Sequence, residues 1–420
     1  MRPPRYLAVL LLAIGFPLLQ SGCVLVKIAD GEKLNPVRHK EATGVSESTK
    51  QFHRTLMVAD LHADTLMLDR GGKRGIQKRH DYGHADVPRW REGNVGFQML
   101  TVATITPKPY SQKLNGGWIL PNAQWVLASF QGWPPRTWTN AREHGLHQAK
   151  KWRVNGDGKA LVPIRTRGDL QRFMAQYYQQ TSLGWVPLDP QNQPVASVLG
   201  LEGCHALQLK DADTDEQIAA RVKEFRDAGF RVLAPTHHFD NEIGGGSEGS
   251  EQGGLTPLGH RLFREMERQQ MICDLSHASN KTINDVLKYH PRIPVLISHT
   301  GVAFHPLVGK QEEARLNTRR QVRQIAQRGG IIGIGLWPEA VGDAEPEYAA
   351  SIIRQCIDDP AIGPKHVVLG SDMDGSVEAA FAANNWCMIT EELRILPEST
   401  LRDVMGGNII RFFLKHLPEE

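Results

Sequence analysis

Residues 214–238 read TDEQIAARVKEFRDAG followed directly by FRVLAPTHH, and this short stretch contains one complete structural unit. Its first part spaces apolar side chains at helical intervals and ends in glycine, which predicts an amphipathic helix. The second part opens as a nearly continuous apolar run and closes on two histidines. Because strands buried on both faces of a parallel sheet have such runs, the stretch predicts a helix followed by a buried strand.

The same unit recurs along the chain. Apolar runs cover residues 55–62, 95–103, 196–203, 230–238, 271–277, 293–300, 329–337 and 366–375. Helical patterns between them cover residues 214–229, 259–270, 278–290 and 318–329. This strand–helix repeat, counted about eight times, predicts an α/β fold, a (β/α)8 TIM-like barrel. An open doubly wound sheet is the alternative, but none of the predicted helices begins with a glycine-rich phosphate-binding loop.

Residues 104–190 separate the second and third apolar runs, so the barrel is expected to carry a large insertion there. An insertion is expected at a loop that follows a strand, where it can form a lid or rim. This one contains four tryptophans, Trp118, Trp125, Trp133 and Trp138. We expect them to pack the insertion onto the barrel, and the alternative is that they line a substrate pocket.

Polar side chains lie at the carboxyl ends of most of the predicted strands. In chain order they are His62, Asp64, Glu202, His237, His277, His299 and Asp372. The carboxyl ends of all barrel strands meet on one face, where barrel enzymes have their active sites. The pair in DLHADTL (60–66) could by itself be two polar residues in a loop. Matching groups on separate strands predict a shared site instead.

The residue types in this set indicate the chemistry. Neutral imidazoles and carboxylates are suited to zinc or a similar divalent ion. The set exceeds what one tetrahedral centre with a bound water needs, so it predicts two metal ions that share a bridging carboxylate and a bridging hydroxide. Such pairs acidify water, polarise a scissile carbonyl and stabilise the oxyanion that forms. The predicted reaction is therefore hydrolysis.

Six motifs follow one another along the chain: DLHADTL (60–66), LGLEGCHAL (199–207), LAPTHHFDN (233–241), CDLSHAS (273–279), ISHTG (297–301) and GSDMDG (370–375). In this order they resemble the motifs of the membrane (renal-type) dipeptidases, a family of zinc metallopeptidases among the metal-dependent hydrolase barrels. The segments VPRWREGNVGFQ (87–98) and MGGNIIRFF (405–413) are also similar to that family. The resemblance spans residues 50 to 413 and implies cleavage of dipeptides, including those with a D-residue at the C-terminal position.

The resemblance also implies which residues hold the metal. His62 and Asp64 would bind one zinc ion, and His277 and His299 would bind the other. Glu202 would bridge the two ions. A pair of zinc ions is thus the cofactor that the family resemblance implies.

Other residues match family positions that contact the substrate or move protons. His237 would contact the substrate carbonyl or the developing oxyanion. Asp372 would orient the bridging water and shuttle its proton, a task suited to a carboxylate within hydrogen-bond reach. Arg315 would pair with the C-terminal carboxylate of the substrate, for which a planar guanidinium is suited.

The chain departs from the family pattern in two places. Cys204 stands where the family usually has glycine, which puts a side chain next to the expected bridging glutamate. Leu316 follows Arg315, where the family has asparagine, and Arg319 and Arg320 lie close enough in sequence to compete for the same role.

Further polar residues near the motifs are expected to have supporting roles. His84 and Asp86 repeat the His–x–Asp spacing but precede a strand, so we expect surface or helix-capping residues. Asp274 is expected to orient a metal ligand through a hydrogen bond. Histidines that neighbour the motifs are expected to support the pocket without binding metal: His205, His238 and His305.

The N-terminal segment MRPPRYLAVLLLAIGFPLLQSGC has two arginines, an apolar stretch and small residues before Cys23, the features of an export signal. Its end, LLQSGC, resembles the box of bacterial lipoproteins. We therefore predict a signal peptide over residues 1–22, a lipidated tether over 23–50 and a dipeptidase-type barrel over 51–420. Secretory cleavage and an uncleaved anchor are the alternatives. The predicted location is the bacterial cell envelope, with a lipid anchor in one of its membranes.

The composition limits the partners of the chain. The formal net charge is +3 over 420 residues and no long basic run is present, which argues against nucleic acid as a partner. The five cysteines are too few for a disulfide framework, so those after Cys23 are expected to be buried free thiols. A homodimer is one assembly compatible with the sequence.

Three functions fit these observations. The first is an exported, lipid-anchored dizinc dipeptidase that acts on short peptides. The second is another binuclear hydrolase of the same barrel type, acting on an amide, a lactone or a phosphoester. The third is a non-catalytic envelope lipoprotein that binds a peptide or a metal. The complete ligand set together with Asp372 favours an enzyme.

Overall fold

The structure is a computed structural model that describes residues 35–68, 75–105, 123–156, 158–190, 192–304 and 316–419. Parallel strands form a closed barrel at its centre: β2 (Val58–Ala63), β3 (Val95–Ala103), β7 (Val195–Glu202), β8 (Phe230–Leu233), β9 (Ile272–Asp274), β10 (Val295–Ala303), β12 (Ile331–Ile334) and β13 (Val367–Leu369). Each strand pairs with the next, and Leu369 pairs with Asp60 to close the ring. Each of the predicted strands is present, so the predicted (β/α)8 barrel is confirmed.

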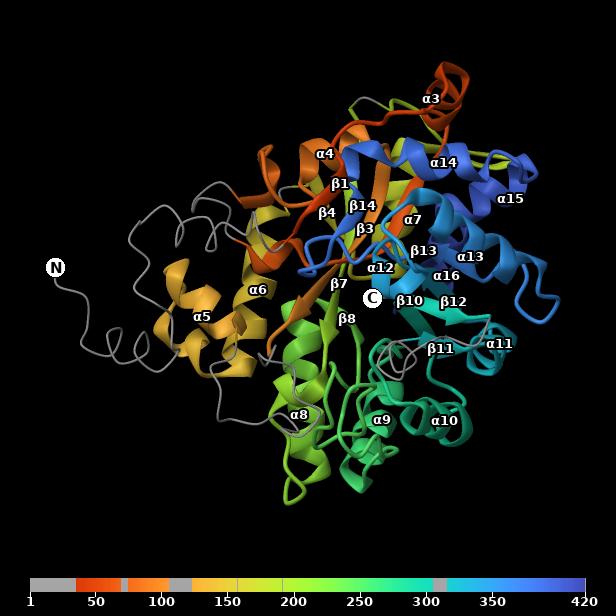
Figure 1. Cartoon of the computed structure of the whole chain (residues 1–420). Helices are drawn as coiled ribbons and strands as arrows, with labels where there is room; N and C mark the ends of the chain where they lie inside the picture. Colours follow the sequence, from red (N-terminus) through yellow and green to blue (C-terminus); the bar gives the residue numbers. More distant parts are fainter. Residues whose placement is uncertain are drawn as a thin grey trace, which may run out of the picture.

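Helices follow the strands and surround the barrel (Figure 1). They include α8 (Asp215–Ala228), α9 (Pro257–Arg268), α10 (Asn280–Tyr289), α11 (Arg319–Gln327) and α13 (Pro346–Asp358). The helix expected over residues 214–229 is α8. Thr214 caps its first turn in a capping box with Gln217, and Gly229 ends it in a left-handed conformation, φ 121°.

The interior of the barrel is apolar at its amino end. One cluster of buried apolar side chains draws on every barrel strand, which places it inside the ring. Two helices contribute to this cluster, α7 (Arg167–Tyr177) and α16 (Asn408–His416). The Asn408 side chain donates hydrogen bonds to the carbonyls of Pro364 and Val367 at the start of β13, so α16 covers the amino end.

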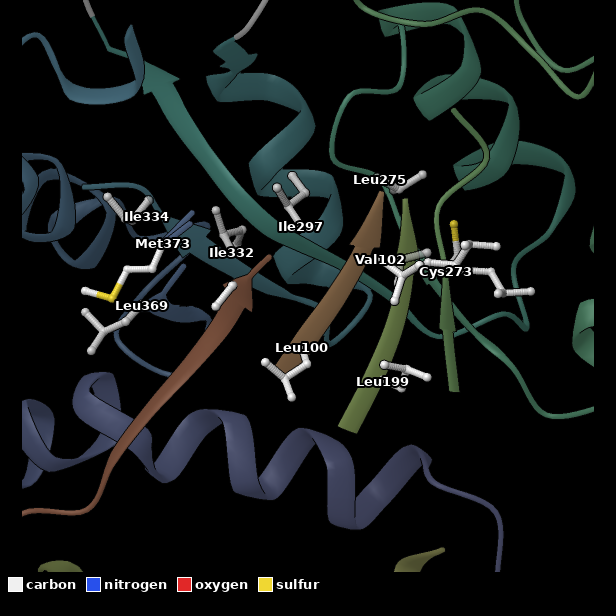
Figure 2. Close-up of a cluster of buried hydrophobic side chains, with 14 of the residues drawn as sticks. Leu100, Val102, Leu199, Cys273, Leu275, Ile297, Ile332, Ile334, Leu369 and Met373 are labelled. Carbon is white, nitrogen blue, oxygen red and sulfur yellow. The ribbon is translucent and has the colours of Figure 1, made fainter. Parts of the chain in front are cut away.

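A larger apolar cluster packs the helices against the strands (Figure 2). Leu100 and Val102 of β3 and Leu199 of β7 belong to it, as does Ile297 of β10. Because both faces of these strands are buried, their sequences are apolar at nearly every position. Polar side chains interrupt this pattern at the carboxyl ends and at a few inner positions such as Asp60 and Ser197.

The insertion after β3 contains α5 (Ala123–Phe130), α6 (Ala141–Asn155), β4 (Leu161–Pro163), α7 and the hairpin β5 (Tyr178–Thr181)–β6 (Gly184–Pro187). Helix α6 packs on the barrel through Trp152, whose Nε1 donates to Ser197 Oγ of β7 at 2.8 Å. The chain then returns to the amino end, where β4 pairs with the start of β7. Within the described part of the insertion, α5 and α6 reach the carboxyl end of β3, where a rim was expected: Trp125 donates to the carbonyl of Thr104 and Gln148 to that of Ala103.

The tryptophans of the insertion have packing roles where they are described. Trp133 is buried, with its ring 4.9 Å from that of His144. Trp125 donates to the carbonyl of Thr104, and Trp138 donates to that of Trp133. Trp133 and Trp138 therefore pack within the insertion, and Trp125 joins it to the residue that follows β3. Trp118 lies outside the described residues.

The N-terminal segment differs from the expected tether in residues 35–50. Strand β1 (Val37–His39) pairs with β14 (Ala379–Phe381), and α3 (Glu47–His53) follows it. Arg38 forms ion pairs with Glu378 and Asp343. These residues are polar because they pack at the surface, and a polar surface strand has the same composition as a linker. Residues 23–34 lie outside the described part of the chain.

The cysteines agree with the expectation of free thiols. Cys204, Cys273 and Cys356 are buried, Cys387 is half-buried, and none of them is in a disulfide. Among the described residues, no helix combines the length and the apolar character needed to cross a membrane.

Candidate active site

The carboxyl end of the barrel brings together side chains that are far apart in the sequence. They lie near or just beyond the carboxyl ends of the barrel strands, except that His299 lies within the longer strand β10: His62, Asp64, Glu202, His237, His277, His299 and Asp372. All are buried except His277, whose side chain is 9% exposed. The structure therefore places all seven described residues of the predicted site together. Arg315 and Cys23 lie outside the described residues.

Glu202 is at the centre of this arrangement. Its Oε1 atom lies 3.3 Å from His62 Nε2, 3.5 Å from His277 Nε2 and 3.9 Å from His299 Nε2. Its Oε2 atom lies 3.4 Å from His237 Nε2. One carboxylate thus contacts groups from both halves of the site.

Among the described residues, four groups of possible ligands have atoms within 4.8 Å of one another, and two of these groups share Glu202. His62 Nε2 lies 3.9 Å from Asp64 Oδ1, and these residues form a group with Glu202 whose ligand atoms all lie within 4.8 Å of one another. His277 Nε2 and His299 Nε2 are 2.9 Å apart and form a second group with Glu202. Glu202 is common to both groups. Each group could hold a metal ion.

Two buried atoms test whether a cation fits this site. His62 Nε2 and Glu202 Oε1 have no hydrogen-bond partner in the described part of the chain, although both are buried. Buried polar atoms are almost always satisfied, so unpaired ones at a site of this kind call for an explanation. A cation between them would accept a lone pair from each. The donor set, imidazole nitrogens and carboxylate oxygens, suits zinc.

The electrostatics of the site favour positive charge. Burial and the negative charge of Asp64 raise the pKa of Glu202 well above its usual range. Burial acts to lower the pKa of His62, but Glu202, Asp64 and Asp372 outweigh it and raise the pKa to about 10. In both cases the protein groups alone favour an added proton. A divalent cation would be stabilised by the same negative charges of the buried carboxylates.

Backbone strain occurs at two of the site residues. His277 and Asp372 have φ values of 60° and 59°, in the left-handed region. This conformation costs roughly 1 kcal/mol or more for a residue with a side chain. The left-handed backbone changes the direction of both side chains just after β9 and β13 end. Strain of this kind is concentrated at functional sites.

His237 makes a backbone hydrogen bond that defines its tautomer. Its Nδ1 lies 3.1 Å from the carbonyl oxygen of Ile105, which only accepts, so Nδ1 carries a hydrogen. Burial lowers the pKa of His237 well below its usual range, which favours the neutral ring. In that state Nε2 presents a lone pair. Donation to an oxyanion would require a second proton at Nε2.

Neighbouring histidines were expected to support the pocket, and the structure places His205 and His238 there. His205 Nε2 lies 2.9 Å from Thr104 Oγ1. His238 Nδ1 lies 2.8 Å from Glu248 Oε1, and its ring is 4.4 Å from that of His277. His237, His238 and His277 also have ligand atoms within 4.8 Å of one another, so His238 is closer to the metal clusters than expected. The remaining one, His305, is outside the described residues.

The expectation that His84 and Asp86 are surface or helix-capping residues was half right. Asp86 is the N-cap of α4 (Val87–Glu92) and accepts from Arg89 N. His84 is fully buried and not at the surface. Its ring Nδ1 accepts from the backbone N–H of Asp374, and the backbone N–H of His84 donates to Asp374 Oδ1. His84 therefore holds the loop that carries Asp372, a contact made across the fold and invisible in a local motif.

Supporting residues beneath the site were partly missed from the sequence. Asp274 accepts hydrogen bonds from Ser276 and Ser298, so its link to the histidine rings is indirect. Asp60 accepts from the backbone and side chain of Ser371, which ties β2 to the end of β13. Ser298 was not singled out, although its hydroxyl lies beside two site histidines. Buried serines next to the ligand motifs were the available signal.

The family departure at residue 204 is accommodated by packing. The Cys204 side chain is fully buried and belongs to the large apolar cluster. Burial raises the pKa of its thiol, which keeps the sulfur protonated and disfavours metal binding. Leu316 is likewise buried and lines a cavity with His277, His299 and Trp337.

A barrel with histidines and carboxylates gathered at the carboxyl ends of its strands is typical of metal-dependent hydrolases. A family model described as membrane dipeptidase (Peptidase family M19) matches residues 46–416. The chain therefore belongs to the membrane dipeptidase family, and it is a metallopeptidase that hydrolyses dipeptides.

Relatives of known name agree with this membership. "Dipeptidase aclJ" of Aspergillus oryzae is 30% identical over 349 residues, 79% of this chain and 70% of that protein. "Uncharacterized dipeptidase C3A11.10c" of Schizosaccharomyces pombe is 27% identical over 358 residues, 80% of this chain and 74% of that protein.

Solved structures support the fold. A metallo peptidase from Rhodobacter sphaeroides, liganded with a phosphinate mimic of the dipeptide L-Ala-D-Ala, is similar with a TM-score of 0.62 and 19% identity. The similarity covers 86% of this chain and 99% of that one. The probable dipeptidase PvdM from Pseudomonas aeruginosa has a TM-score of 0.64 at 13% identity, over 88% and 98% of the two chains.

Proposed function

We propose that this dipeptidase uses two zinc ions, held by His62, Asp64 and Glu202 on one side and by Glu202, His277 and His299 on the other. The observation that carries the proposal is the position of Glu202. Its Oε1 atom lies within 3.9 Å of imidazole nitrogens from both groups. A carboxylate shared in this way is what a two-metal site requires.

The chain's own residues would divide the chemistry among them. When bound, the two ions would acidify a water molecule and polarise the scissile carbonyl. Asp372, whose Oδ1 lies 3.7 Å from His62 Nε2, would take the proton of the attacking water and deliver it to the departing amine. His237 faces the same space from β8 and would contact the carbonyl oxygen, as donor only when protonated at Nε2. Arg315 would bind the C-terminal carboxylate.

The substrate is proposed to be a dipeptide, including one with a D-residue at the C-terminal position. Two observations support this: the motif resemblance, and the fold shared with a protein that was crystallised with a mimic of L-Ala-D-Ala. A site that accepts a C-terminal residue of either chirality must recognise the substrate carboxylate and not the side chain alone. The chirality preference is therefore a measurable property of the site.

The proposal is tested on purified residues 24–420. We expect about two zinc ions per chain by elemental analysis, and turnover of dipeptides of matched L,L and L,D composition. Glu202→Ala should lose turnover and bind less zinc while the barrel still folds. Turnover of lactones or phosphoesters without turnover of dipeptides would contradict the substrate class, and full activity in Glu202→Ala would contradict the bridging role.

We also propose that the mature protein is a lipoprotein of the bacterial cell envelope, anchored through Cys23. Support comes from the arginine-containing apolar segment that ends in LLQSGC. Expression in a bacterial host should give a membrane-associated protein whose N-terminal peptide carries acyl chains by mass spectrometry. Cys23→Ser should abolish the lipid, and an acylation-independent membrane association would contradict the anchor. The molar mass of purified residues 24–420 in solution would decide whether this fragment forms a homodimer.

A further inference from the structure

One serine hydroxyl lies between two histidines that belong to different metal groups. Ser298 Oγ is 2.9 Å from His62 Nδ1 and 2.9 Å from His299 Nδ1. The two rings are neighbours, with centroids 3.8 Å apart, yet His62 comes from β2 and His299 from β10. Ser298 is fully buried, as is the His62 side chain. The hydroxyl is therefore shielded from bulk solvent.

The chain of hydrogen bonds below Ser298 has a defined direction. Ser298 Oγ lies 3.1 Å from Ser276 Oγ, and Ser276 Oγ donates to Asp274 Oδ1 at 2.8 Å. The same Asp274 oxygen accepts from the backbone N–H groups of Ser276 and Ser298, each at 3.0 Å. An ionised carboxylate only accepts hydrogen bonds. It therefore orients the Ser276 hydrogen toward itself, so between the two hydroxyls Ser298 is the donor. The Ser276 oxygen shares this acceptor role with the backbone N–H groups of Ser298 at 3.0 Å and His299 at 3.3 Å.

This direction fixes the histidine tautomers. A hydroxyl has one hydrogen and two lone pairs. With its hydrogen on Ser276, the Ser298 oxygen can accept one hydrogen from His62 Nδ1 and one from His299 Nδ1. Both neutral rings then carry their lone pair on Nε2, the atom that faces Glu202 in each case. That is the tautomer a metal ligand needs.

We propose that Ser298 is a positioning residue for both metal sites at once, holding His62 and His299 as Nε2 ligands through a single hydroxyl fixed by Ser276 and Asp274. This inference rests on the proposed two-zinc site. A residue of this kind touches neither metal nor substrate and acts through the two rings. Its loss would leave two buried N–H groups without an acceptor and would free both rings to rotate or change tautomer.

The test is zinc affinity, measured without any substrate. Zinc binding to metal-free protein is followed by competition with a chromophoric chelator, which gives two dissociation constants. Loss of a partner that orients a metal-ligating histidine typically costs about 10–100-fold in affinity. Ser298→Ala should therefore weaken both constants by about that factor. Ser276→Ala should weaken both by less, because Ser298 keeps its oxygen and loses only the acceptor for its hydrogen.

A matched control exists on β7. Ser197 is also a fully buried serine whose hydroxyl accepts a hydrogen bond, in this case from Trp152. Ser197→Ala removes the same atom far from the metal groups and should leave both constants unchanged. Thermal unfolding of each metal-free variant shows whether the fold is retained. Should Ser298→Ala fail to fold, Ser276→Ala carries the same comparison.

The possible results separate this inference from the proposed function. Wild-type protein that binds no zinc would overturn both. Wild-type protein that binds two ions, with Ser298→Ala binding as tightly as Ser197→Ala, would overturn the role of Ser298 alone. Weakening of only one of the two constants would also overturn it, since the inference requires one hydroxyl to serve both sites. Weakening of both constants, with Ser197→Ala unaffected, would support it.

Discussion

His53, the last residue of α3, precedes β2, and His62 lies near the carboxyl end of that strand. Both are buried, but their surroundings have opposite effects on a proton. Burial lowers the pKa of His53 to about 4. Burial also acts on His62, but the carboxylates of Glu202, Asp64 and Asp372 raise its pKa to about 10. One end of the strand excludes positive charge and the other attracts it.

The hydrogen bonds of the two rings show why. His53 Nδ1 lies 2.8 Å from Thr390 Oγ1 and its Nε2 lies 3.1 Å from the carbonyl of Gly93, so both nitrogens are satisfied by neutral groups. Among the described residues, His62 is hydrogen-bonded at Nδ1 by Ser298, and its Nε2 faces carboxylates without a hydrogen-bond partner. Burial therefore does not distinguish a structural histidine from a functional one. The partners of the second nitrogen do.

The largest effect is expected from His62→Ala. Removing this ligand takes away several kcal/mol of metal-derived stabilisation, and at 1.36 kcal/mol per factor of ten this predicts a loss of kcat/KM of at least about 10³-fold. The bound zinc should fall as well. His53→Gln is the control at the other end of the strand and should retain both zinc and activity. Loss of activity in the control, or its retention in His62→Ala, would break the comparison.

Asp372→Asn should lower kcat by about 10²–10⁴-fold, the usual contribution of a general acid–base group. An amide cannot take up the proton of the attacking water. The zinc content should stay unchanged, because neither proposed metal group includes Asp372, although its carboxylate also lies within 4.8 Å of ligand atoms of His62 and His299. Asp359→Asn is a control, since Asp359 is a buried carboxylate that pairs with Arg319 and Arg323 outside the site. If Asp372→Asn lowers the zinc content as well as kcat, Asp372 is a metal ligand and not only a proton-transfer group.

The barrel and its ligand motifs could be predicted because both depend on local patterns. Strands buried on two faces are apolar at nearly every position, so a polar residue at their end, such as Glu202 or His299, is conspicuous. The barrel topology then brings those ends together without any further information. Sequence reasoning placed seven of these residues on one face for this reason.

The remaining features depend on contacts between distant segments. Ser298 resembles any small polar residue until β2 places His62 above it. His84 seemed to be a surface residue because its partner, Asp374, is at the other end of the chain. Strand β1 is polar and pairs with β14 at the surface, so its composition is that of a linker. None of these roles leaves a periodic or compositional pattern.

The amino end of the barrel should respond to mutation in stability and not in chemistry. Phe413 of α16 is fully buried, with its ring 5.1 Å from that of Phe97. Phe413→Ala should lower the free energy of unfolding of the metal-free protein by about 3–5 kcal/mol, measured with urea. Zinc affinity should be unchanged in the folded fraction. Phe130→Ala, at a side chain 40% exposed, is the control and should cost much less.

The pH dependence of stability tests His53 directly. The unfolded chain takes up a proton on this histidine near pH 6.5, while the native protein does so only near pH 4. Between these values the unfolded state binds more protons, so the metal-free protein loses stability as the pH falls through 6.5, and the loss is complete below 4. The shift corresponds to about 3 kcal/mol.

His53→Gln removes the titrating group, so its free energy of unfolding should fall less steeply than that of the wild type between pH 7 and pH 4. Other buried histidines, such as His144 with a pKa lowered to about 3, titrate in both proteins and cancel in the difference. Parallel curves would mean that His53 is not held neutral by burial. Its contrast with His62 would then rest on hydrogen bonding alone, because the opposite charge preference of the two strand ends would be lost.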